Sequence, residues 1–155
     1  MQPLVSRPAR SAERHSHDHR QQSEQERFIM NAIAQPSRNL SIFDKYGGIR
    51  ILRHVIMDYY DRVLDSDVIG HFFEDTDMVK LIDHQTKFFT MVLGGPAHFS
   101  DARLASAHKH MRLSHVEFDE AVLLLNETLA DAHFAQDDQN TVIAAIEARR
   151  RILVA

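Results

Sequence analysis

Residues 71–110 read HFFEDTDMVKLIDHQTKFFTMVLGGPAHFSDARLASAHKH, and they carry the clearest structural signal in the chain. Apolar residues recur every three or four positions over 78–93, which predicts an amphipathic helix, and the Gly-Gly-Pro at 94–96 ends it. Polar side chains, above all Gln85 and His108, interrupt this apolar pattern. Because a buried polar group without a partner costs roughly 1–3 kcal/mol, the stretch predicts a core that encloses something polar or metallic.

Helical spacing continues over the rest of the chain after residue 40. Residues 49–64, 116–131 and about 138–153 each place apolar side chains three and four positions apart, and no convincing segment alternates with the period of two typical of strands. The stripe on the first of these helices comprises Ile49, Leu52, Val55, Ile56, Tyr59, Tyr60 and Val63. The predicted fold class is therefore all-α.

Length and composition restrict the class of protein. A chain of 155 residues that is 44% hydrophobic predicts one globular domain. The net charge of −4 argues against a nucleic-acid partner, and no apolar run is long enough to span a membrane. The chain has no cysteine, which excludes disulfides and thiolate metal ligands. We expect a cytoplasmic protein, and the sequence does not indicate an oligomeric state.

Residues 1–40 form a predicted N-terminal extension, and residues 41–155 form the globular domain. The extension has few apolar residues in its first half, so it cannot bury enough surface to order itself, and we expect it to be largely disordered. A short helix is expected near 22–34, before Pro36. The extension lacks the apolar core of about 7–15 residues that a secretory signal contains.

Two polar side chains are expected to point into the core. Gln85 shares a helix face with Leu81 and Phe88, at spacings of four and three residues, and Tyr60 lies on the apolar stripe of its own helix. A buried amide or phenol needs a hydrogen-bond partner. The two side chains could therefore bond each other, or both could address a small polar ligand.

His108 is a candidate metal ligand in a short segment, residues 104–111, after the glycine break. An imidazole can bind a metal through one nitrogen while the other bonds a backbone carbonyl. A lone inward histidine is more often a satisfied core residue, so this signal is weak by itself. A shared site with His110 is disfavoured, because residues two positions apart point to different sides of a helix.

The order of several short motifs resembles the truncated haemoglobins, most closely their first group. The resemblance covers about residues 41–153, and its motifs are Phe43-Asp44-Lys45-Tyr46-Gly47-Gly48, Tyr59-Tyr60-Asp61-Arg62-Val63-Leu64, His71-Phe72-Phe73, Thr76-Asp77-Met78, His84-Gln85-Thr86-Lys87-Phe88-Phe89, Leu93-Gly94-Gly95-Pro96, Ala107-His108 and His115-Val116-Glu117-Phe118-Asp119. The resemblance implies a two-over-two helical sandwich around one haem b.

The resemblance also implies a role for individual residues. His108 matches the proximal ligand of the haem iron, Tyr60 and Gln85 match the distal hydrogen-bonding pair, and Leu81 matches a position that faces the ligand. The aromatic side chains expected to pack against or near the porphyrin are Phe72, Phe73 and Phe88. Some relatives attach haem covalently to a histidine of the last helix, but residues 138–153 contain none.

His84 leaves two alternatives open. It precedes Gln85 by one residue and follows Leu81 by three. Some members of the family carry a histidine here that binds the iron as a sixth ligand, which would give a bis-histidyl haem. The other alternative is that His84 points to solvent or pairs with a haem propionate.

Three functions follow from the resemblance. The first is reversible binding of dioxygen, nitric oxide and carbon monoxide combined with nitric oxide dioxygenase chemistry, for which an external reductase is expected because the chain has no flavin or nicotinamide motif. The second is non-enzymatic oxygen binding, storage or gas sensing. The third is a bis-histidyl electron-transfer or peroxidase-like protein, which is favoured if His84 binds the iron.

Overall fold

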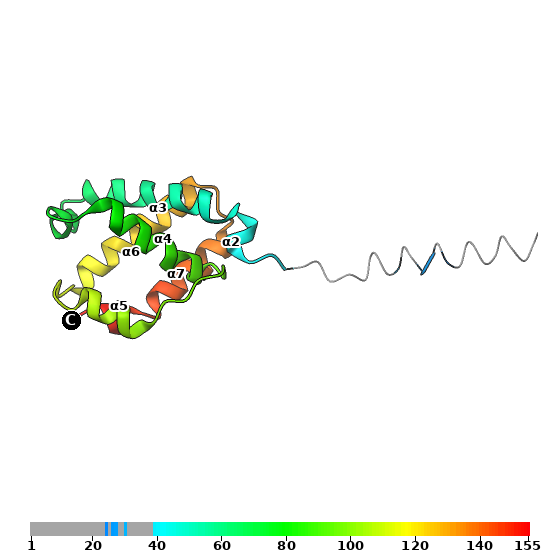
Figure 1. The fold of residues 1–155 in the computed structure, drawn as a ribbon. Coiled ribbons are helices and arrows are strands. Elements are labelled where there is room, and N and C mark those ends of the chain that lie inside the picture. The colour runs from blue at the N-terminus through cyan, green and yellow to red at the C-terminus, as the bar shows by residue number, and fades with distance from the viewer. Residues whose placement is uncertain (1–23, 25, 28–29, 31–38) are drawn as a thin grey trace, which may run out of the picture. The chain divides into compact units, whose positions relative to one another are not determined.

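Two helical pairs build the domain, and a shorter helix closes the space beside them (Figure 1). The computed structural model describes residues 24, 26–27, 30 and 39–155, so the predicted extension, including the short helix near 22–34, lies almost entirely outside the described residues. The elements of the domain are α2 (Ile42–Lys45), α3 (Gly48–Leu64), the 3₁₀-helix η1 (Gly70–Phe73), α4 (Met78–Val92), α5 (Asp101–His108), α6 (His115–Asp131), α7 (Gln136–Glu147) and α8 (Arg150–Leu153).

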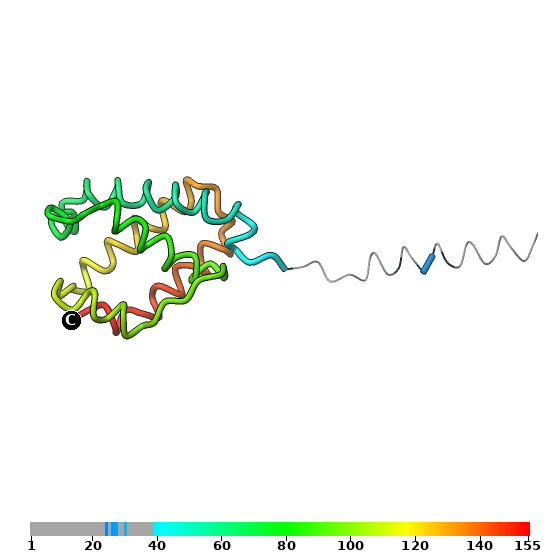
Figure 2. The backbone as a smooth tube through the Cα atoms, viewed as in Figure 1, coloured from blue at the N-terminus to red at the C-terminus, as the bar shows by residue number. Residues whose placement is uncertain are grey.

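The pairs are α3 with α4 and α6 with α7, and α3 also packs against α6. This arrangement is a two-over-two helical sandwich. In Figure 2 the chain passes from the end of α4 through a loop, residues 93–100, into α5, which runs along one open side. The described residues contain no strand, only an isolated bridge between Leu113 and Val154. None of the helices in this part of the chain is long and apolar enough to cross a membrane.

Local sequence explains where the helices begin. The N-caps of α2, α4, α5 and α6 each accept a hydrogen bond from a backbone N–H of the first turn, and they are Ser41, Asp77, Ser100 and Ser114. Ser114 and Glu117 form a complete capping box, in which each side chain accepts a bond from the other residue's backbone N–H. These caps fix the first residues of the helices that carry the site.

The glycine break after α4 is required by close packing. Gly94 adopts a φ of +80°, which favours glycine. A Cβ on Gly95 would lie 2.6 Å from Cγ of Phe43, so a larger residue would push α2 away from the end of α4. The backbone N–H of Phe43 donates to the carbonyl of Leu93 at 2.9 Å, which holds the same junction.

The structure corrects three details of the predicted elements. His108 ends a helix that begins at Asp101, three residues before the predicted segment. The single helix predicted at about 138–153 is two helices, because the backbone N–H of Arg149 bonds the carbonyl of Ile146 in a tight turn. Ile49 is 57% exposed, because it lies in the first turn of α3 and the apolar stripe is covered only from Leu52 onward.

Candidate functional site

Two adjoining cavities lie between the helical pairs and α5. The smaller cavity has a volume of about 110 Å³ and the larger one about 420 Å³. The larger volume lies within the roughly 300–1,000 Å³ typical of cofactor and ligand pockets. Residues that line both cavities are Tyr60, Phe72, Phe73, Gln85, Phe88, Leu104, His108 and Met111. Because the walls are shared, we treat the two cavities as one candidate site.

All eight residues singled out by the sequence line the larger cavity: Tyr60, Phe72, Phe73, Leu81, His84, Gln85, Phe88 and His108. They come from four elements, α3, η1, α4 and α5. The first and last of them in the chain, Tyr60 and His108, are 48 positions apart. Aromatic rings make much of the wall, and Phe73 packs edge-on against Tyr60 with ring centroids 5.7 Å apart. The site is therefore largely apolar with a few polar groups that point inward.

His108 is the last residue of α5, and one of its ring nitrogens forms a hydrogen bond with the backbone. Its Nδ1 lies 2.8 Å from the carbonyl oxygen of Leu104. Because a carbonyl can only accept, Nδ1 carries the hydrogen, and Nε2 keeps its lone pair. Burial lowers the pKa of His108, which favours this neutral form. The imidazole is thus prepared to bind a metal through Nε2.

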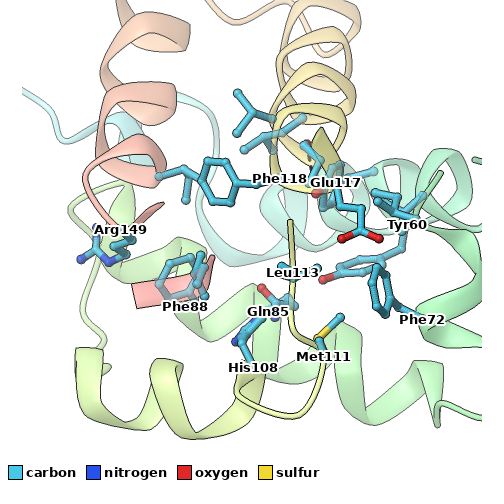
Figure 3. Close-up of a pocket in the computed structure, with 18 of the residues that line it drawn as sticks. Tyr60, Phe72, Gln85, Phe88, His108, Met111, Leu113, Glu117, Phe118 and Arg149 are labelled. Atoms are coloured by element: carbon cyan, nitrogen blue, oxygen red, sulfur yellow. Dashed lines mark hydrogen bonds between the residues drawn. The ribbon is translucent and has the colours of Figure 1, made fainter. Parts of the chain in front are cut away.

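The two polar groups on the other wall do not bond each other. Tyr60 is 6% exposed, and burial raises the pKa of its hydroxyl well above the usual value. Among the described residues, neither the Tyr60 hydroxyl nor the Gln85 amide has a hydrogen-bond partner. No fully buried side-chain nitrogen or oxygen lacks a partner there, so the polar atoms of Tyr60 and Gln85 border open space. The first alternative from the sequence, mutual bonding of Tyr60 and Gln85, is therefore wrong. In Figure 3 the Tyr60 hydroxyl points into the middle of the site.

The neighbouring Tyr59 differs from Tyr60, because its hydroxyl has a hydrogen-bond partner in the core. Its hydroxyl donates to the carbonyl oxygen of Ala121 at 3.2 Å, and its ring meets that of Tyr60 edge-on at 5.1 Å. The Tyr59 hydroxyl thus donates to the backbone of α6, whereas the Tyr60 hydroxyl is available to donate to a ligand in the cavity.

His84 is exposed at the level of the whole residue, yet it also lines the larger cavity. It follows Leu81 by one turn, which places both at the same side of α4.

The donor set fits the haem that the resemblance implies. In the described part of the chain, no three histidine or acidic side chains gather closely enough to hold a metal ion by themselves. A metal bound at His108 must therefore bring its other ligands with it, as a porphyrin iron does. The aromatic walls and the free Nε2 of His108 meet that requirement.

Sequence reasoning missed several residues of the site. The smaller cavity is also lined by Leu113, Glu117, Phe118 and Arg149, and the larger by Phe99, Arg103 and His110. The capping-box spacing of Ser114 and Glu117 was visible in the sequence, but it gave no sign that Glu117 also faces a cavity. Arg149 could not be found, because it reaches the site only through the turn that separates α7 from α8.

Comparisons with known proteins agree with one another. The family model described as bacterial-like globin matches residues 41–153. A group 1 truncated haemoglobin of Tetrahymena pyriformis is 33% identical over 111 residues, which is 72% of this chain and 92% of the relative.

Solved structures give the same result. The truncated haemoglobin of Tetrahymena pyriformis in its Fe(III) form has a TM-score of 0.69 at 32% identity, covering 75% of this chain and 99% of that one. The 2/2 haemoglobin of Synechococcus sp. PCC 7002, solved in the cyanomet state with covalently attached haem, has a TM-score of 0.68 at 28% identity, covering 74% and 98%.

Proposed function

We propose, from the premise that this chain belongs to the bacterial-like globin family and is a truncated haemoglobin, that it binds dioxygen reversibly and converts nitric oxide to nitrate. Haem is the cofactor of this family, and it supplies an iron that binds diatomic gases. Binding of a ligand at haem is thus the general activity. The identity of the reaction and the roles of single residues are the proposal.

His108 is the proposed proximal ligand. The bond from its Nδ1 to Leu104 fixes the tautomer and the ring orientation, and leaves Nε2 for the iron. Phe72, Phe73 and Phe88 line both cavities and would pack around the cofactor. These aromatic side chains exclude water, which strengthens any hydrogen bond made inside the site.

The observation that carries the proposal is the pair of unpartnered donors on the wall made by α3 and α4. Tyr60 and Gln85 offer a hydroxyl and an amide N–H to a polar ligand in the cavity. Each hydrogen bond contributes about 0.5–1.5 kcal/mol, or roughly a two- to tenfold slower loss of the ligand. Leu81 beside them is apolar and would admit a gas without competing for these bonds.

A retained and polarised dioxygen is suited to attack by nitric oxide. The net reaction joins one nitric oxide, one dioxygen and one electron to give nitrate, so each turnover needs an electron from outside the site. An external reductase is therefore the proposed partner, since the sequence carries no flavin or nicotinamide motif.

The test is to mix the dioxygen-loaded protein with nitric oxide in a stopped-flow instrument and to measure nitrate. We expect rapid conversion with one nitrate per haem. Slow or absent nitrate formation, with normal reversible dioxygen binding, would leave oxygen binding, storage or sensing as the function.

A second candidate, a bis-histidyl electron-transfer or peroxidase-like protein, is favoured by one observation. His84 lines the larger cavity together with Gln85 and His108. Absorption spectra of the ferric and ferrous protein would then show six-coordinate low-spin iron, and His84→Leu would abolish that signature. Unchanged spectra in the variant would remove His84 from the iron and favour its alternative role toward solvent or a propionate.

A further inference from the structure

Glu117 is the one carboxylate among the described residues that lines either cavity. It belongs to the first turn of α6, and it lines the smaller cavity along with Tyr60 and His108. Figure 3 shows its carboxylate on the same side of the site as the Tyr60 ring, with the Arg149 guanidinium on the opposite side. A charged group at this place acts directly on whatever occupies the cavity.

The capping box fixes the position of this carboxylate. Oε2 of Glu117 accepts from the Ser114 backbone N–H at 2.7 Å and from the Ser114 hydroxyl at 2.8 Å. These two bonds lower the pKa of the Glu117 carboxyl, with a smaller contribution from nearby His71. Glu117 is therefore ionised at neutral pH and cannot swing freely away from the cavity.

The charge of Glu117 is not neutralised by an ion pair, in contrast to the cation at the opposite side. Both donors on Oε2 are neutral groups of Ser114. Arg149, which also lines the smaller cavity, forms an ion pair with Asp101 at 3.1 Å and donates to the carbonyl of Ala145. Among the described residues, Glu117 is thus the charged side chain on the lining of the smaller cavity that no ion pair neutralises.

We propose that Glu117 is a specificity-determining residue that disfavours anions in the ligand cavity, so that the site selects neutral diatomic gases over anionic ligands. The proposal rests on the proposed function, because it assumes that ligands bind beside Tyr60 and Gln85. It has a further consequence for that function, since an anionic product such as nitrate would be expelled by the same charge.

The size of the effect follows from Coulomb's law. At an effective dielectric constant of about 20, two unit charges roughly 10 Å apart change an equilibrium about tenfold, and screening by salt reduces this toward threefold. The binding of neutral ligands such as carbon monoxide should be almost unaffected by the charge of Glu117.

The test compares an anion with a neutral gas on the haem-loaded full chain. Glutamine at 117 keeps an acceptor for the capping box but removes the charge. We expect Glu117→Gln to tighten azide binding to the ferric protein by about three- to tenfold, and to change carbon monoxide affinity of the ferrous protein less than about twofold. Both are measured by absorption titration.

The matched control is Asp61→Asn, which removes one exposed carboxylate of α3 that lines neither cavity. Its azide affinity should equal that of the unaltered protein. Unchanged azide affinity in Glu117→Gln, or equal gains in both variants, would overturn the proposal, and so would a parallel change in carbon monoxide affinity.

A second measurement needs no variant and covers the case in which Glu117→Gln retains no haem. Raising the ionic strength screens Glu117, so azide should bind the unaltered protein more tightly; constant or weaker binding would contradict the proposal. Failure of the proposed function has a different signature, because the unaltered protein would then bind no dioxygen or would form nitrate slowly, and neither result is measured with azide.

Discussion

The two walls that face each other across the cavities are anchored very differently. Helices α3 and α4 form one wall and belong to the core, with six and four buried residues respectively. Helix α5 forms the other wall with a single buried residue, Leu104, and packs chiefly against the short α8. The wall formed by α3 and α4 is therefore part of the buried core, whereas the wall formed by α5, which carries His108, is held by few contacts with the rest of the protein.

The two walls have different tasks in this protein. Tyr60 and Gln85 are donors whose direction matters, and a rigid wall preserves that direction. Helix α5 lines the larger cavity with Leu104, Ala107 and His108, so the cofactor itself would cover its inner face. We infer that haem binding and the order of α5 depend on each other.

The largest effect is expected from His108→Ala. The variant loses the proposed iron ligand on the weakly anchored wall, and it should retain little haem after gel filtration. The loss should exceed the roughly 10–100-fold weakening typical of removing a second-shell partner of a metal ligand. His98→Ala, which alters an exposed histidine outside both cavities, should keep its haem. Normal retention in His108→Ala would show that the proximal assignment is wrong.

The next largest effect is a loss of stability when a cavity is created in the core beneath the wall formed by α3 and α4. Ile56 is 1% exposed and lines neither cavity, so Ile56→Ala should lower the free energy of unfolding by about 2–5 kcal/mol. Urea denaturation of the haem-free protein measures this. Leu104→Ala on α5 should cost less there, and an equal or larger cost would break the contrast between the walls.

Removing haem should loosen one wall and spare the other. Hydrogen exchange of the α5 amides should accelerate by about tenfold or more in the haem-free protein, since the ligand stabilises only the state that binds it. The amides of α3 and α4 should keep most of their protection. Uniform acceleration over all three helices would mean that the domain behaves as one unit.

A smaller effect is expected from Tyr60→Phe, which removes one donor from the wall formed by α3 and α4. Dioxygen should dissociate about two- to tenfold faster, because one hydrogen bond to the ligand is lost. Tyr59→Phe is the matched control, since that hydroxyl donates to the carbonyl of Ala121 and not into the cavity. Equal dissociation rates in the two variants would exclude a special role for Tyr60.

The smallest effect concerns pH and the support of α5 by α8. Both carboxylate oxygens of Glu147 accept from Arg150 at 2.8 Å, and these bonds lower the pKa of Glu147. A depressed folded-state pKa stabilises the fold above the ordinary glutamate range, and that contribution is lost as the pH falls through the folded value. Thermal unfolding between about pH 6 and 3 should therefore be less pH-dependent in Glu147→Gln. An identical pH profile would show that this pair does not hold α8.

Much of the fold could be predicted, because its signals are local. The apolar spacing of residues 78–93 and the glycine break at 94–96 agree with the observed helix α4, which spans Met78–Val92. The family resemblance then supplied the two-over-two arrangement, which the structure and the comparisons confirm. The errors arose at a helix end and at a break: Ile49 is uncovered, and Arg149 divides the last helix.

The candidate site was predictable only in part. Tyr60 and Gln85 could be selected because polar side chains on apolar faces need a partner, whereas His108 was a weak signal by itself and received its role from the family resemblance. The cavity role of Glu117 could not, because its spacing to Ser114 already has a complete local explanation as a capping box. A side chain with two roles shows only the local one in the sequence.

The all-α class, the helical segments and the polar residues that need partners follow from the amino-acid sequence, because apolar periodicity and glycine breaks act over a few neighbouring residues. Which of these residues share a cavity depends on the packing of the helices. So does the fact that Tyr60 and Gln85 form no hydrogen bond with each other, and that Glu117 has no ion-pair partner while Arg149 has one. The physical reason is that distances between residues far apart in the chain depend on how whole helices pack, and that packing is set by the sum of many small contacts.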